Sequence, residues 1–447
     1  MPRCVTLTVA GVVWTLGTIL SGWGLADEKN RREQAVRGDR QAMTGDARWL
    51  YNDLETGFEA AKQSGKPLLV VLRCVPCKAC TGIDESVVRA KDLQPLLDRF
   101  VCVRVINANA LDLKRFQFDY DLSFSTMFFH ADGTLYGRFG SWQHQLDELE
   151  VSTAGFQAAL ERVLELHRDY ATVRDALAPK QGGPTPFSIP IEIPGLAGKY
   201  QRELQWEGNN VVQSCVHCHQ IGDAYRTWYR QRAEAIPSDL IYPMPEPKTI
   251  GLSIDHRTSG KVRRVESSSI AERSGFKPGD VIRAIDGAPI VSVADIAWAL
   301  HRAPEAGTMR WTVLRDGMEK SMDVELPSDW RFDSDISSRV GTWAMRAMAL
   351  GGMVLRPLSD EQRTASQLDA KELGLVVHNL GYYGEHAAAK NAGFQKGDVI
   401  VALEGFEGPL TESRLIGELL RRYPNKTRLD AIVLRDGKRI PLQWPIQ

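Results

Sequence analysis

The chain has 447 residues, too many for one ordinary hydrophobic core, and its length predicts about two to four domains. Hydrophobic residues make up 43% of the chain and charged residues 25%, which are the fractions of a soluble globular protein. The formal net charge of −1 gives no argument for nucleic acid or an anionic membrane surface as a partner, and we expect neither.

The N-terminus has the pattern of an export signal. Arg3 precedes an uncharged, mostly apolar run that ends at Leu25, and the small residues Gly24 and Ala26 stand where a signal peptidase cleaves. Residues 1–26 are therefore predicted to be a signal peptide. An uncleaved membrane anchor stays open, because the run is long for a signal peptide. In both cases we expect a periplasmic protein with no later transmembrane segment.

The next part of the chain predicts a polar leader and an α/β domain. Residues 27–48 are polar and mixed in charge, which indicates a loose leader. Residues 49–177 predict a helix over 49–66, a buried strand in "PLLVVLR", a helix, a strand in "VCVRVIN" and a hairpin that turns at Asp132-Gly133. Further helices close this domain.

Proline and glycine mark the boundary that follows. Residues 178–198 are rich in both and predict a linker, and residues 199–246 form a short segment that carries two cysteines. A second proline break, "YPMPEP", ends that segment.

The remaining chain contains one module twice, in a first repeat (247–328) and a second repeat (340–446). "SGFKPGDVIRAIDG" is echoed by "AGFQKGDVIVALEG" 118 residues later, and "VLRDG" recurs after 120 residues. These motifs resemble PDZ domains of the bacterial Deg-protease type. The resemblance implies α+β domains whose groove, between an edge strand and a helix, accepts an extended peptide of a partner protein.

The same resemblance implies a loop that binds a terminal carboxylate. "IGLS", the residues Ile250, Gly251, Leu252 and Ser253, fits this loop in the first repeat, and "GGMV" fits it in the second. The alternative is that one or both repeats only pack or dimerise. We do not expect a serine protease, because the chain has no Gly-x-Ser-Gly-Gly nucleophile turn.

Three closely spaced cysteines follow the first buried strand, in "GKPLLVVLRCVPCKAC". This stretch resembles the active-site strand of thioredoxin-like proteins, where a helix N-terminus lowers the pKa of the first cysteine of a Cys-x-x-Cys pair. "CVPCK" favours Cys74 and Cys77 as the pair. In thioredoxin-like proteins nine residues commonly separate the Lys-Pro that enters the strand from the nucleophile, and here nine residues separate Pro67 from Cys77. The downstream "TGIDESVVRAKDL" resembles the stretch after the second cysteine of that family, so the resemblance favours Cys77 as the attacking thiolate and Cys80 as the resolving thiol. Cys74 is then a third thiol that competes for Cys77.

One position departs from the thioredoxin pattern. Ser125 stands before Thr126 in "FSTMFF", where the family has a proline that helps to dock the substrate backbone. Two other interpretations of the three cysteines stay open. They are a structural disulfide with a spare thiol, or a soft-metal site for Cu(I) or Zn. Cys102 is predicted to be a buried strand residue.

A second Cys-x-x-Cys occurs in "CVHCH" and matches the attachment signature of c-type cytochromes. It predicts haem c, with thioether bonds to Cys215 and Cys218, iron ligation by His219 and Met244 as the candidate sixth ligand. A rival is a Zn or Cu site made by the same cysteines and histidine with His217. A disulfide without cofactor and a chance match also stay open.

The whole layout resembles the thioredoxin-like/PDZ domain-containing (seleno)proteins of planctomycete bacteria, in a cysteine-containing form. The resemblance covers most of residues 50–445 and implies exported redox chemistry. We therefore predict a thiol–disulfide oxidoreductase-like protein that binds client peptides in its PDZ grooves and is served by a redox partner protein. The rivals are a periplasmic scaffold with structural or metal-loaded cysteines, and a c-type haem electron carrier.

Overall fold

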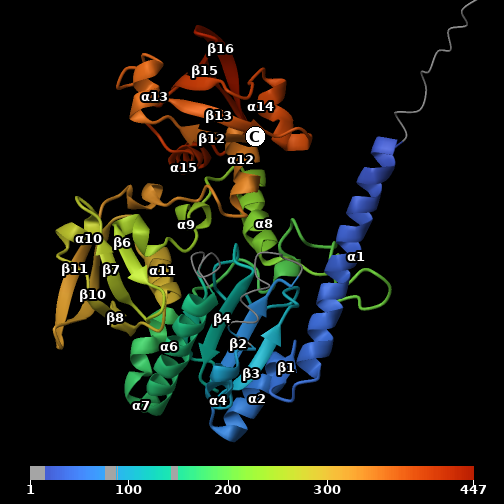
Figure 1. Ribbon diagram of the computed structural model, residues 1–447, viewed down its shortest axis with the longest axis vertical. Helices are drawn as coiled ribbons and strands as arrows, with labels where there is room; N and C mark the ends of the chain where they lie inside the picture. Colours follow the sequence, from blue (N-terminus) through green and yellow to red (C-terminus); the bar gives the residue numbers. More distant parts are fainter. Residues whose placement is uncertain (1–15, 76–86, 88, 142–148) are drawn as a thin grey trace, which may run out of the picture.

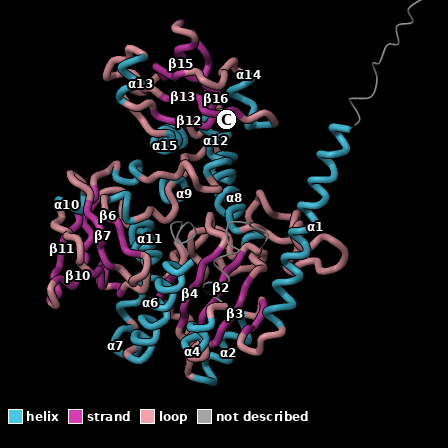
Figure 2. Tube along the Cα trace, in the orientation of Figure 1, coloured by secondary structure: helices cyan, strands magenta, loops and turns pink. Residues whose placement is uncertain are grey.

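The computed structural model describes residues 16–75, 87, 89–141 and 149–447. This described part of the chain contains three sheets, in three units that lie around helix α8 (Cys218–Gln231) (Figure 1). Each sheet is covered by helices, as Figure 2 shows by colour. Cys77 and Cys80 lie outside the described residues, so the roles assigned to them stay predictions.

The first unit is the predicted α/β domain, with strands in the order β1-β3-β2-β4-β5. Strands β1, β3 and β2 run parallel, and β4 is antiparallel to both β2 and β5. The strands are β1 (Trp49–Tyr51), β2 (Leu68–Arg73), β3 (Val101–Val105), β4 (Phe124–Phe129) and β5 (Leu135–Phe139). Because helices cover both faces, every residue of β2 and β4 is buried, as continuous apolar runs predict.

The helices of this unit pack on opposite faces of the sheet. Helix α2 (Leu54–Ser64) buries Ala61 against one face, and α6 (Leu149–Arg168) buries Leu160 against the other. The short helices are η3 (Lys91–Leu93), α4 (Gln94–Leu97), α7 (Tyr170–Val173) and η4 (Asp175–Lys180). The predicted helix over 49–66 is wrong at its start. Its first residues form β1, and α2 begins only where the Asp53 carboxylate accepts the N–H of Thr56.

The loose leader predicted over 27–48 is also wrong. Helix α1 (Leu16–Thr44) runs through it, and its charges find buried partners. Asp39 accepts from the Arg104 guanidinium of β3 at 2.5 and 3.1 Å, and Glu33 accepts the N–H of Val212 at 2.9 Å. Some of the charged side chains in this segment therefore bind buried partners and are not simply exposed to solvent. Among the described residues, no helix is long and apolar enough to cross a membrane.

The predicted linker 178–198 is packed rather than free. It contains the short helix η5 (Pro190–Glu192), and Ile193 and Leu196 pack with Tyr225 of α8 in one apolar cluster. Its proline and glycine residues shape the chain without loosening it. Helix α9 (Ser238–Ile241) follows α8 and leads into the first repeat.

The two repeats have the same strand order, β6-β7-β8-β10-β11 and β12-β13-β14-β15-β16, with β9 beside β8 in the first. The strands of the first are β6 (Leu252–Asp255), β7 (Lys261–Val265), β8 (Val281–Ile285), β9 (Ala288–Pro289), β10 (Gly307–Arg315) and β11 (Met318–Leu326). Those of the second are β12 (Met353–Pro357), β13 (Leu375–Leu380), β14 (Val399–Leu403), β15 (Thr427–Arg435) and β16 (Lys438–Ile446). In each repeat the first strand in the chain, β6 or β12, lies at one edge of the sheet.

Helices occupy similar places in the two repeats, except that a helix stands between the first two strands of the second repeat only. In the first they are η6 (Pro247–Ile250), α10 (Ile270–Arg273) and α11 (Val293–Arg302), followed by η7 (Trp330–Asp333). In the second they are α12 (Thr342–Leu350), α13 (Asp360–Ala365), η8 (Gly384–Ala387), α14 (Ala388–Asn391) and α15 (Glu412–Arg422). Both α11 and α15 bury an apolar face, made by Val293, Ile296, Ala297 and Leu300 in the first repeat and by Leu415, Ile416, Leu419 and Leu420 in the second.

The repeated motifs meet in space. Asp280, from "GFKPGD", pairs with Arg315, from "VLRDG", at 2.6 Å, and Asp398 pairs with Arg435 at the same distance. Both aspartates are about 1% exposed. The two motifs of each repeat are therefore the two halves of one buried ion pair, which explains why they recur together.

Candidate functional site

The first repeat is docked on the α/β domain through one buried carboxylate. Asp295 of α11 accepts the N–H of Arg138 in β5 at 3.0 Å and the Lys180 ammonium at 2.7 Å. It also accepts the N–H of Val291 at 3.0 Å. Burial lowers the pKa of Lys180 to about 8, and the Asp295 charge opposes this. The carboxylate thus joins two domains and the segment between them.

Strand β5 and helix α11 approach closely at this contact. A Cβ atom on Gly137 would lie 2.6 Å from Asp295 Oδ2 and 2.6 Å from a methyl of Val291, so only glycine fits. The Arg138 guanidinium lies 3.7 Å from the ring centre of Trp298, and the Ser292 hydroxyl donates to the Arg138 carbonyl at 2.6 Å. Helix α11 is therefore fixed against the sheet.

A groove of about 310 Å³ runs between edge strand β6 and helix α11. Leu252, Ser253 and Ile254 line one wall, and Val293 and Ala297 line the other. The predicted peptide-binding residues Leu252 and Ser253 therefore lie in a groove of the expected kind. An edge strand beside an apolar helix face suits a peptide that adds as a further strand.

Basic side chains dominate the charges around this groove. They are Lys248, Arg257, Arg263 and Arg264. The two carboxylates in the lining are those of Glu246 and Asp255. This excess of positive charge suits a peptide that carries acidic side chains.

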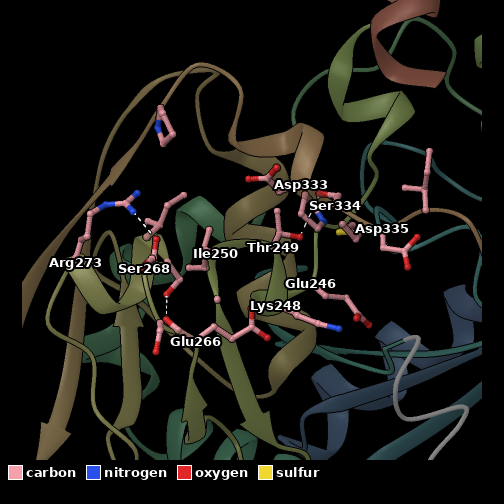
Figure 3. Close-up of a pocket in the computed structure, with 18 of the residues that line it drawn as sticks. Glu246, Lys248, Thr249, Ile250, Glu266, Ser268, Arg273, Asp333, Ser334 and Asp335 are labelled. Carbon is pink, nitrogen blue, oxygen red and sulfur yellow. Dashed lines mark hydrogen bonds between the residues drawn. The ribbon is translucent and has the colours of Figure 1, made fainter. Parts of the chain in front are cut away.

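The other two predicted residues, Ile250 and Gly251, line a neighbouring cavity of about 480 Å³. Figure 3 shows that Ile250 and Thr249 lie between Glu266 and Ser268 on one side and Ser334 on the other. Gly251 closes η6 with a φ of 87°, and its N–H donates to the Lys248 carbonyl at 2.9 Å. That N–H is therefore already used, and the Gly251 carbonyl accepts the N–H of Glu266.

The groove reaches the cysteine-bearing edge of the α/β sheet. Ser141, which follows β5, also lines it. Strands β2 and β5 are both antiparallel to β4, so their C-terminal ends lie at one edge. Cys74 follows β2, two strand spacings or about 10 Å from β5. The groove therefore reaches the same sheet edge that bears Cys74.

The second cysteine pair lies at that edge too. Cys74, Cys215 and Cys218 line one cavity of about 20 Å³, and Cys74 Sγ is 3.1 Å from His217 Nδ1. The sequence motifs alone predict two separate cysteine clusters. No local signal links them, because 143 residues separate Cys74 from His217.

The residues proposed for haem c do not fit a haem as they are packed. A cavity of about 20 Å³ is far too small for a porphyrin beside Cys215 and Cys218. Met244 is buried against Ala297 and Trp298 of α11, and the half-buried His219 lies next to His217 with ring centres 5.9 Å apart. Within the described ranges, no group of three His, Cys, Asp or Glu residues is placed to hold a metal ion. Haem c stays a prediction.

Burial controls the protonation of these thiols. It raises the pKa of Cys215 to about 11 and that of Cys218 well above its ordinary value, with the charges of Cys74 and Cys215 adding to the effect on Cys218. Cys102 is buried in β3 as predicted, and burial raises its pKa to about 12.

The corresponding groove of the second repeat is filled by its own chain. The N–H of Leu355 in edge strand β12 donates to Glu412 at 2.7 Å, and Arg346 of α12 pairs with the same carboxylate. Tyr242 donates to the Ser413 carbonyl at 2.8 Å. The edge that a peptide would extend is therefore already bonded.

Comparison with known proteins identifies two domains. The thioredoxin-like family matches residues 49–131, and the PDZ domain family matches residues 249–326. This confirms both predicted domain types.

Several curated relatives are also similar to the chain. A "Probable periplasmic serine endoprotease DegP-like" of Pseudomonas fluorescens is 26% identical over 177 residues, which is 40% of this chain and 35% of the relative. A protein of the same name from Pseudomonas savastanoi pv. phaseolicola is 27% identical over 220 residues, 48% of this chain and 42% of the relative. The "Periplasmic serine endoprotease DegP" of Escherichia coli is 27% identical over 150 residues, 34% of this chain and 27% of the relative. The chain thus spans less than half the length of these relatives, and it combines a thioredoxin-like domain with a PDZ domain.

Proposed function

We propose that the protein is an exported thiol–disulfide oxidoreductase that holds a client peptide in its PDZ groove. The observation that carries the proposal is the position of Ser141. This residue of the thioredoxin-like domain lines the PDZ groove at the sheet edge that bears Cys74. A client segment bound along β6 is thereby held beside the cysteine cluster, which raises the effective concentration of its disulfide there.

The chemistry follows from the sequence. The Cys77 thiolate attacks one sulfur of the client disulfide, and the other client sulfur leaves as a thiolate. Cys80 then attacks the Cys77 sulfur, which releases the second client thiol and leaves a Cys77–Cys80 disulfide. A dithiol redox partner protein returns this pair to the reduced state.

The names of the relatives support export but not proteolysis here. They are described as periplasmic, in agreement with the signal peptide predicted over residues 1–26. They are also described as serine endoproteases. The sequence of this chain has no Gly-x-Ser-Gly-Gly turn, so we do not assign it proteolysis, and we propose peptide binding from the PDZ match over residues 249–326.

An insulin-reduction assay tests the oxidoreductase. Replacing Cys77 by serine removes the attacking sulfur, so we expect the rate of the Cys77→Ser variant to fall by at least about 100-fold. Cys102→Ala is the matched control, because Cys102 is buried in β3, and it should keep the parent rate. Equal rates for the parent and Cys77→Ser would overturn the assignment of Cys77 as the attacking thiolate, and no reduction by either protein would support a scaffold with structural cysteines.

A further inference from the structure

The "CVHC" segment is held rigidly against the thioredoxin-like sheet by a buried asparagine. Asn109 donates to the Ser214 carbonyl at 2.8 Å and accepts the N–H of Val216 at 2.7 Å. These bonds fix the backbone on both sides of Cys215. Helix α8 begins at Cys218, directly after His217. The second Cys-x-x-Cys is thus a built element of the domain contact.

Three thiols converge at this contact. Cys74, Cys215 and Cys218 line the same cavity of about 20 Å³, which is large enough for little more than one water molecule. The 3.1 Å contact between Cys74 Sγ and His217 Nδ1 ties Cys74 to the residue before Cys218. Sulfur atoms that share so small a cavity need only short movements to exchange a disulfide bond.

We propose that Cys74, Cys218 and Cys215 form an internal thiol relay that carries oxidation from the client-facing edge to a Cys215–Cys218 disulfide. Cys74 attacks an incoming disulfide, one half of which leaves as a thiolate. Cys218 then attacks the Cys74 sulfur, so that the second half leaves and a Cys74–Cys218 disulfide forms. Cys215 finally attacks Cys218, and Cys74 leaves as a thiol. The incoming disulfide is reduced to two thiols, the Cys215/Cys218 dithiol is oxidised, and the protons lost by these two thiols go to the two released ones.

This relay goes beyond the proposed function, because it needs neither Cys77 nor Cys80. It can therefore be tested in the full-length chain that carries Cys77→Ser and Cys80→Ser. If the relay fails while insulin reduction by the parent succeeds, the relay alone is wrong. If insulin reduction fails while the relay succeeds, the proposed client chemistry alone is wrong.

The probe is bis(nitrobenzoate) disulfide, an aromatic disulfide whose released thiolate absorbs visible light. Reduced protein of the Cys77→Ser, Cys80→Ser background receives one equivalent under anaerobic conditions. We expect both halves of the probe to be released, no nitrobenzoate adduct in the intact mass, and a Cys215–Cys218 disulfide in peptide mapping. Release of one half only, with a lasting adduct on the protein, would overturn the relay.

Single variants in the same background identify the intermediate. Cys215→Ser should release both halves and trap a Cys74–Cys218 disulfide, because the last step is blocked. Cys74→Ser should slow release at least about tenfold. Cys102→Ala is the control and should match the background. A trapped disulfide in Cys215→Ser that omits Cys218 contradicts the relay. Circular dichroism checks that each variant is folded. If Cys215→Ser does not fold, peptide mapping of the Cys77→Ser, Cys80→Ser protein tests the relay by the presence or absence of a Cys215–Cys218 disulfide.

Discussion

The first and second repeats share one fold and differ at the peptide groove. Each has the same strand order and the same buried ion pair, Asp280–Arg315 or Asp398–Arg435. At the N-terminus of the groove helix, however, the first repeat has Val293 and the second has Glu412. The repeated motifs therefore determine the framework, and residues outside them decide whether the edge strand is open.

The difference lies at one backbone N–H group of the edge strand. Ile254 in β6 and Leu355 in β12 are the third residues of their strands and follow the same irregularity in register. The N–H of Leu355 is bonded to Glu412, whereas Val293 offers no acceptor to Ile254. An edge strand that is bonded to its own helix cannot accept a further strand at that residue. We therefore propose the first repeat, rather than the second, as the peptide-binding one.

The largest expected effect tests what the repeats share. Replacing Asp280 or Asp398 by alanine leaves a largely buried arginine without its partner, so each change should lower the free energy of unfolding of its repeat by about 3 kcal/mol. Urea unfolding followed by tryptophan fluorescence measures this. Glu319→Ala, at an exposed position of β11, is the control and should change it by less than about 0.5 kcal/mol. A small effect at only one of the two sites would break the structural equivalence of the repeats.

The ion pair also gives a pH dependence. Burial alone would raise the pKa of Asp280, but hydrogen bonds from Arg315 and the Lys277 N–H bring it below its ordinary value. The stabilisation is therefore complete above the unfolded-state pKa, near about 4, and is lost as the pH falls through the lower folded-state pKa. We expect the stability difference between the parent and Asp280→Ala to be constant from neutral pH to about 5 and to shrink below it.

The next effect comes from giving the first repeat the feature that closes the second. In Val293→Glu the new carboxylate can accept the N–H of Ile254, so an acidic peptide should bind at least about tenfold more weakly. Fluorescence anisotropy with a labelled acidic peptide measures the affinity. Val293→Ile is the control and should keep it within about threefold. Unchanged binding by Val293→Glu would show that the peptide does not extend β6.

The reciprocal change tests whether Glu412 closes the groove of the second repeat. Glu412→Val with Arg346→Met removes both charges of the buried pair together, which avoids an unpaired arginine. Made in the Val293→Glu background, it should free the N–H of Leu355 and restore some peptide binding, by about three- to tenfold over that background. The same anisotropy titration measures it. No gain would mean that α12 and Tyr242 block the second groove without help from Glu412.

The smallest expected effect on peptide affinity comes from an exposed charge beside the groove of the first repeat. Arg264 is exposed at the first groove, so Arg264→Ala should weaken binding of an acidic peptide only about two- to threefold, mainly through slower association. Stopped-flow association rates at low and high salt measure this, since salt screens an exposed charge. A neutral peptide is the control and should bind both proteins alike. An equal loss for the neutral peptide would assign Arg264 a packing role.

Local sequence patterns predicted most helices and strands. They could not predict contacts between residues that are far apart in the chain. The apolar run of β2 and the repeated "GD" and "VLRDG" motifs are visible in short windows of sequence, so the α/β domain and the two repeats could be predicted. The helix over the predicted leader depends on the pairing of Asp39 with Arg104 in β3. A pair between residues so far apart has no signal in a short window of sequence. The polar composition of residues 27–48 alone therefore led to the wrong prediction of a loose leader.

The site was predicted in parts for the same reason. Leu252 and Ser253 follow from a local motif, and the structure places them in the groove. The contribution of Ser141 and the approach of Cys74 to Cys218 depend on how domains dock. That docking is set by Asp295, whose partners Arg138 and Lys180 lie more than a hundred residues earlier. A single sequence offers no pattern for such a pair.

Helix α11 serves two surfaces within a length of about 15 Å, set by its ten residues. Val293 and Ala297 line the groove, while Asp295 and Trp298 contact residues of the thioredoxin-like domain. Ile296 and Leu300 of the same helix lie in the core of the first repeat. One short helix thus forms a wall of the peptide groove, part of a hydrophobic core and the contact between two domains, so few of its positions are free to change independently.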